Sequence, residues 1–185
     1  LASRAVVDPT ATSTAAFLIM NASVNVYGID VKPTVEAVAY GVYASSSYVR
    51  VSSVNVDSGG RIWQAGVRVS SWSAVSHASI TVQSAHGIWL HGSSMTSVSY
   101  STALNSNTGF SALYLLGVSS NNVSMTFASN ASGYGALLEY AQGNVVMQSS
   151  FATGGAWSAL YLDESSSNTI TQSYIQDYIR TELGL

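Results

Sequence analysis

The chain has 185 residues, 47% of them apolar, which is enough for one domain with a continuous core. Only 8% are charged, against roughly a quarter in an average protein, so surface helices laced with Glu–Lys pairs are nearly excluded. The net charge of −3 disfavours a nucleic-acid partner, and the absence of cysteine excludes disulfides and thiolate metal sites.

A short pattern recurs along the chain: a small residue, an apolar one, a variable one and a second apolar one. It stands at 16–19, 41–44, 66–69, 87–90, 112–115, 136–139 and 159–162. A second series, in which one apolar residue follows another by five places, falls between these segments. Its pairs are Val24/Ile29, Val49/Val54, Val75/Ile80, Val98/Ala103, Val123/Ala128, Val146/Phe151 and Ile170/Ile175. Both series repeat every 21 to 26 residues, which predicts seven coils.

Each coil contains three short alternating runs separated by Ser, Asn and Gly, a pattern typical of strands and turns. A repeat of this length predicts a right-handed parallel β-helix with three sheets, because each coil buries its apolar face only against its neighbours. The two predicted internal stacks are Val42, Val67, Ile88, Leu113, Leu137 and Leu160, and Val49, Val75, Val98, Val123, Val146 and Ile170. Asn121, Asn144 and Asn168 share one turn position and are expected to hydrogen-bond from coil to coil.

The sequence of these coils, with Gly-Ile-x-Leu followed by a Ser-Ser-Asn-Asn turn, resembles the parallel β-helix repeats of the pectin-lyase-like superfamily. The resemblance extends from Ala16 to Ile175. It implies a fold and leaves the activity open, because that superfamily includes polysaccharide lyases, glycoside hydrolases, esterases, epimerases, phage tailspikes and non-catalytic surface proteins.

Strand alternation makes the middle residue of each first strand face outward. The expected outward residues are Leu18, Tyr43, Arg68, Trp89, Tyr114, Leu138 and Tyr161. Strict alternation would bury Glu139, so a local shift or bulge that turns it outward is expected there. Rings one strand apart suit stacking against sugars, which makes Tyr43, Arg68, Trp89, His91, Tyr114 and Tyr161 candidate glycan-binding residues. The alternative is that these side chains only cover an exposed sheet.

Catalytic candidates on this face are weak. By the resemblance, a hydrolase would use paired carboxylates, for which Glu139 and, on the adjacent coil, Asp163 and Glu164 are the candidates. A lyase would use a cationic base, for which Arg68 and His91 are the candidates. The histidines, His77, His86 and His91, hold different positions in their coils, so neither a metal site nor a cofactor is predicted.

We therefore expect a non-catalytic extracellular or cell-surface β-helix with possible glycan binding; the alternative is a polysaccharide-processing enzyme or a fragment of one. The longest apolar run, 15–20, is too short for a membrane span, and no signal peptide is evident. Residues 1–185 are interpreted as one domain, a segment of a longer solenoid. Gly184-Leu185 repeats the start of a coil, so the chain is expected either to continue in a longer solenoid or to make end-to-end or homo-oligomeric contacts. The alternative is a tight β-cap formed by residues 179–185.

Overall fold

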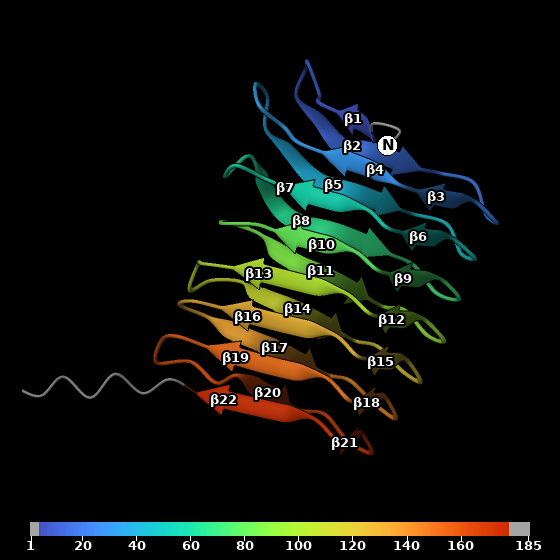
Figure 1. Cartoon of the computed structure of the whole chain (residues 1–185). Helices are drawn as coiled ribbons and strands as arrows, with labels where there is room; N and C mark the ends of the chain where they lie inside the picture. The colour runs from blue at the N-terminus through green and yellow to red at the C-terminus, as the bar shows by residue number, and fades with distance from the viewer. Residues whose placement is uncertain (1–3, 178–185) are drawn as a thin grey trace, which may run out of the picture.

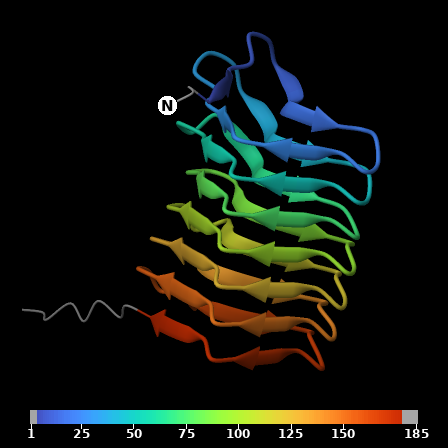
Figure 2. The same ribbon diagram turned by 45° about the vertical axis from the view of Figure 1, so that its right-hand side comes forward.

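The computed structural model describes residues 4–177, which form strands and turns without a helix. The chain winds through seven stacked coils, each of which passes through three sheets in turn (Figures 1 and 2). All neighbouring strands in these sheets pair in parallel, one coil apart in sequence. The prediction of a seven-coil parallel β-helix with three sheets is confirmed.

Sheet A comprises β1 (Ala5–Val7), β4 (Ile29–Val31), β7 (Asn55–Asp57), β10 (Ser79–Thr81), β13 (Thr102–Asn105), β16 (Phe127–Asn130), β19 (Ser150–Thr153) and β22 (Tyr174–Asp177). Sheet B comprises β2 (Ser13–Ile19), β5 (Val38–Ala44), β8 (Ile62–Val69), β11 (His86–His91), β14 (Ser111–Leu116), β17 (Tyr134–Glu139) and β20 (Leu160–Asp163). Sheet C comprises β3 (Asn25–Tyr27), β6 (Arg50–Ser52), β9 (Ala74–Ser76), β12 (Ser97–Ser99), β15 (Asn122–Ser124), β18 (Val145–Met147) and β21 (Thr169–Thr171).

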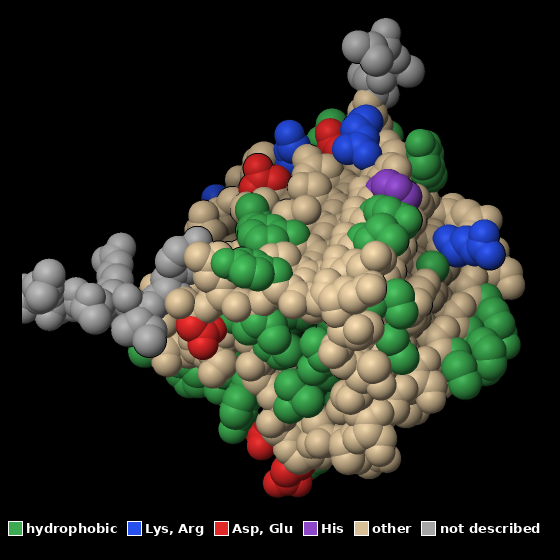
Figure 3. Space-filling model, turned by 60° about the horizontal axis from the view of Figure 1, so that its bottom comes forward, with side chains coloured by type: hydrophobic (Ala, Val, Ile, Leu, Met, Phe, Trp, Pro, Cys, Tyr) green, Lys and Arg blue, Asp and Glu red, His purple; other side chains and the backbone are tan. Residues whose placement is uncertain are grey.

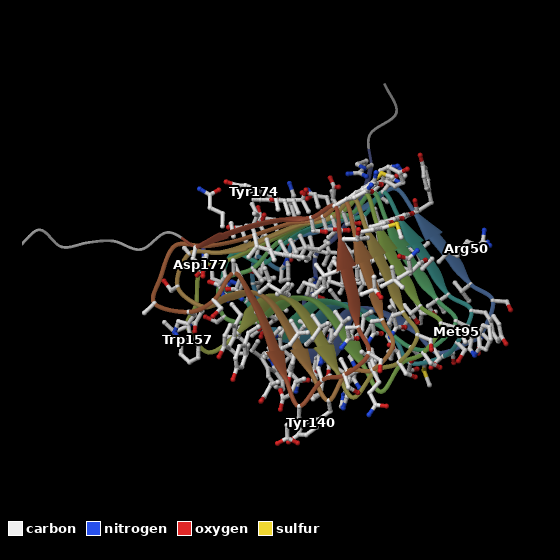
Figure 4. The ribbon with its side chains drawn as sticks, turned by 90° about the horizontal axis from the view of Figure 1, so that it is seen from below. Arg50, Met95, Tyr140, Trp157, Tyr174 and Asp177 are labelled. Carbon is white, nitrogen blue, oxygen red and sulfur yellow. The ribbon has the colours of Figure 1, made fainter. Side chains whose placement is uncertain are left out.

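The three sheets enclose a core in which equivalent apolar side chains lie above one another (Figure 4). Sheet B contributes Val42, Val67, Ile88 and Leu113, all fully buried, as predicted. Leu160, in the last described coil, is partly buried against the same cluster. Because each coil covers the apolar face of the next, the core is continuous along the solenoid.

The predicted register is wrong in two places. Ala136, rather than Leu137, pairs with Leu113, so Leu138 is buried and Leu137 faces outward. In sheet C the residue paired with Val75 is Val51, whereas Val49 is buried in the turn that precedes β6.

The asparagine ladder forms as predicted. The side-chain oxygen of Asn144 accepts hydrogen bonds from the backbone N–H and the side-chain amide of Asn121, at 2.9 and 3.0 Å. Asn144 in turn donates to the side-chain oxygen of Asn168 at 2.9 Å. The ladder satisfies turn amides that the core would otherwise leave without partners.

Residues 184 and 185, on which the expected start of another coil depends, lie outside the described residues. Within residues 4–177 there is no helix long and apolar enough to cross a membrane.

Candidate functional site on the aromatic face

The outward side of sheet B, which we call the aromatic face, carries one side chain per coil in strict register. The row is Leu18, Tyr43, Arg68, Trp89, Tyr114, Leu137 and Tyr161. Leu138, predicted in this row, is instead fully buried, and Leu137 takes its place. Apart from this exchange, the residues predicted to face outward do so. Figure 3 draws another side of the molecule, on which charged side chains are also few and lie among apolar patches.

Arg68 lies among aromatic rings in the middle of this row. Its guanidinium carbon is 4.7 Å from the Trp89 ring centroid and 5.1 Å from that of Tyr43. Its Nη1 donates to the Tyr40 hydroxyl at 2.8 Å, and its Nη2 lies 3.1 Å from His91 Nδ1. The guanidinium of Arg68 is therefore already engaged by aromatic rings and hydrogen-bond partners within the protein.

The rings of Trp89 and Tyr114 are also packed against neighbours. Trp89 stacks on His91 with centroids 5.0 Å apart and on Tyr114 at 5.9 Å. Tyr114 is only 9% exposed. The centre of the aromatic face is thus a layer of mutually packed rings, whereas Tyr161 at one end is 41% exposed.

Glu139 faces outward, as expected. It pairs in register with Asp163 on the next coil, and the Tyr114 hydroxyl donates to its Oε2 at 2.5 Å. Burial, followed by this hydrogen bond and the charge of Glu139, raises the pKa of Tyr114. The exposure of Glu139 comes from the shifted register of the whole strand β17. The two predicted carboxylates are thus neighbours, with one of them bound by a tyrosine.

The histidines do not converge on a common point. His86 is largely buried, and its Nδ1 accepts the Ser111 N–H at 3.1 Å. Burial lowers the pKa of His86 to about 4. Burial and the charge of Arg68 lower the pKa of His91. In the part of the chain that the structure describes, no three His, Cys, Asp or Glu side chains form a group that could hold a metal ion.

The structure also has a hollow at the N-terminal end of the aromatic face, which the sequence did not predict. Its volume is about 540 Å³, and it is lined by Thr12, Ser13, Thr14, Ala39, Tyr40, Tyr43, Trp63 and Gln64. Among the residues predicted to bind a glycan, it includes Tyr43.

A β-bulge shapes this hollow. Val38 pairs with Ile62 and Tyr40 pairs with Ala65, so two residues of β8, Trp63 and Gln64, oppose one residue of β5. The Trp63 side chain is 52% exposed at the rim, and the Gln64 amide oxygen accepts a hydrogen bond from Tyr40. The change in spacing, from 24 residues at the first pair to 25 at the second, is the sequence signal of this bulge.

The winding and the register of the sheets define a single-stranded parallel β-helix protein, with a ring-covered sheet on one side. The chain belongs to the NosD family: the family model described as "Periplasmic copper-binding protein (NosD)" matches residues 20–185. This family has the pectin-lyase-like β-helix fold, so the resemblance noted in the sequence is confirmed. Comparison with curated proteins and with solved structures found no match.

Proposed function

We propose that this chain is a non-catalytic β-helix that acts outside the cytoplasm and binds a neutral glycan in the hollow beside Trp63. The observation that carries the proposal is the bulge in β8, which directs Trp63 and Gln64 toward the same hollow as Tyr43. Bulges of this kind often redirect side chains next to functional sites. The periplasmic location in the family description supports a role outside the cytoplasm.

The chemistry of the hollow suits an uncharged sugar. Trp63 offers an exposed indole face on which a pyranose ring can stack. The exposed residues Thr12, Ser13 and Thr14 supply hydroxyl and backbone groups, and Gln64 has an amide group that can donate to a sugar oxygen. The nearby guanidinium of Arg68 is held by Tyr40 and the surrounding rings, so the hollow offers little to a carboxylate.

The family description also names copper, which prefers imidazole and sulfur ligands. The described residues do not fit such a site. The chain has no cysteine, and its four methionines lie in four different coils. His77 stacks on the ring of Tyr100, His86 is largely buried with its Nδ1 engaged, and His91 lies beside the guanidinium of Arg68, whose charge opposes a bound cation. We assign no copper chemistry to residues 4–177.

Affinity electrophoresis in gels that contain dextran, laminarin or xylan tests the proposal. At least one of these neutral glycans is expected to retard the chain, and Trp63→Ala should weaken the binding about tenfold or more because stacking is lost. Tyr174→Ala is the control, because Tyr174 is an exposed ring, at 61%, but lies on sheet A, away from both the hollow and sheet C. Failure of all three gels to retard the chain, or equal retardation of Trp63→Ala, contradicts the proposal.

A reducing-end assay on the same glycans separates binding from turnover. No new reducing ends are expected. If they appear and Glu139→Gln abolishes them, the carboxylate pair is catalytic and the chain is a glycoside hydrolase instead.

A further inference from the structure

Sheet C carries a second set of exposed rings, on a side of the molecule separate from the aromatic face. Tyr48, Trp72 and Met95 each stand two residues before a strand of this sheet. Their φ angles are 61°, 56° and 54°, in the left-handed region that large side chains rarely occupy. All three side chains are more than half exposed, and the rings of Tyr48 and Trp72 stack with centroids 5.9 Å apart.

The floor beside this row consists of small residues, an asparagine and one arginine. Strand register aligns Asn25, Arg50, Ala74 and Ser97 across four coils. The short side chains of Ala74 and Ser97 leave an open hollow of about 430 Å³ against the ring row. A second hollow of about 460 Å³ shares Asn25, Arg50 and Ala74 with the first. The two hollows together form a groove along sheet C that is centred on Arg50.

The described residues of this groove include a positive charge, that of Arg50, and no negative one. The strands of sheet C from β3 to β18 contain no Asp or Glu, nor do the turns that border them from residue 45 to residue 149. Arg50 is exposed. It takes no part in the ion pair found among residues 4–177, which joins Arg4 to Asp30. Arg50 and Met95 both lie on the outside of this side of the molecule (Figure 4). A guanidinium without a carboxylate partner therefore stands beside a shelf of stacked rings.

We infer that this groove binds an acidic oligosaccharide, with a sugar carboxylate on Arg50 and the sugar rings against Tyr48 and Trp72. A guanidinium binds a carboxylate through two parallel hydrogen bonds, and aromatic faces accept the apolar faces of pyranose rings. The groove lies on a different sheet from the hollow beside Trp63. It also differs in the property that selects an acidic ligand, because its guanidinium, that of Arg50, has no carboxylate partner among the described residues. The inference does not depend on neutral-glycan binding at the aromatic face.

Isothermal titration with tetragalacturonate and with its methyl ester tests the inference, because the ester keeps the sugar rings and removes their charge. At low salt the acid is expected to bind about tenfold or more tightly than the ester. Arg50→Gln should reduce binding of the acid to the level of the ester. Arg50→Lys should restore part of it, since lysine keeps the charge without the planar fork. Trp72→Ala should weaken binding of both ligands.

Trp63→Ala is the control for the second site and should bind tetragalacturonate like the unmodified chain. Equal binding of acid and ester, full binding by Arg50→Gln, or no binding of the acid overturns the inference. If Trp63→Ala alone abolishes binding of the acid, the ligand lies on the aromatic face; the inference then fails while glycan binding beside Trp63 stands. Unchanged circular dichroism of each variant excludes unfolding as the cause.

Discussion

His86 shows how one residue links burial to pH. It lies at the start of β11, where its ring contacts the rings of Tyr114 and Trp89, with centroids 4.5 and 5.4 Å away. Burial removes water from the imidazole and disfavours its charged form, which lowers the pKa from 6.5 to about 4. The neutral ring accepts the Ser111 N–H and thereby connects β11 to β14.

This pKa shift predicts loss of stability in acid. Between pH 6.5 and about 4 the unfolded chain takes up a proton that folded His86 does not, so the free energy of unfolding falls as the pH falls through this window. From pH 7 to pH 4.5 the unmodified chain should lose about 2 kcal/mol more than His86→Gln, whose amide oxygen can still accept the Ser111 N–H. Urea unfolding at several pH values measures the difference.

His77→Gln is the control for this experiment, because His77 is exposed in a turn. It should keep the pH dependence of the unmodified chain. Parallel pH profiles for the unmodified chain and His86→Gln would show that His86 is not the group responsible.

At the scale of elements, the register of β17 decides which side chains the core receives. Had Leu137 pointed inward, alternation would have placed the carboxylate of Glu139 in the core, at a cost of several kcal/mol. The observed register buries Leu138 and leaves Glu139 outside with Tyr114. The cost of burying a charge therefore explains why this strand departs from the alignment suggested by its small residue.

The register predicts unequal costs for two adjacent leucines. Leu138→Ala should lower the free energy of unfolding by about 2 to 4 kcal/mol, because it leaves a cavity among fully buried side chains. Leu137→Ala, on the outward side of the same strand, should cost less than about 1 kcal/mol. Denaturant unfolding of both variants provides the measurement, and a larger effect at Leu137 would refute the register.

For the whole molecule, the small number of charges determines how stability responds to salt. The solenoid is held by stacked apolar residues and by backbone and asparagine hydrogen bonds, and the ion pair found within residues 4–177, Arg4–Asp30, lies at the first described coil. Surface ion pairs contribute about 0 to 1 kcal/mol each. Screening by salt should therefore change the free energy of unfolding of this fold only slightly.

We accordingly predict that raising NaCl from about 0.05 to 0.5 M changes the free energy of unfolding by less than about 0.5 kcal/mol. Sodium sulfate at equal ionic strength should stabilise the chain, because sulfate is excluded from protein surface and strengthens apolar burial. Thermal unfolding followed by circular dichroism distinguishes the two salts. A marked loss of stability in NaCl would point to charge interactions that the described residues do not contain.

The sequence by itself determined the repeat, and with it the fold and most of the outward row. Residues such as Val67, Ile88 and Leu113 recur with the period of a coil, and stacking is the physical way to bury them. The same period aligned Tyr43, Arg68 and Trp89 on one face and Asn121 with Asn144 in one turn. These features are local and periodic, so they can be read from spacing alone.

The sequence predicted a slip at Glu139, but only the tertiary structure decided that the whole of β17 shifts, that β8 carries a bulge, and what these departures expose. The shift of β17 depends on the cost of burying Glu139, and the bulge that directs Trp63 and Gln64 depends on pairing with β5. The accessibility of a ring is likewise a property of its neighbours: Tyr114 is nearly covered while Trp72 is exposed, although both belong to regular rows. Such differences arise from contacts between coils, which the spacing of residues within one coil does not record.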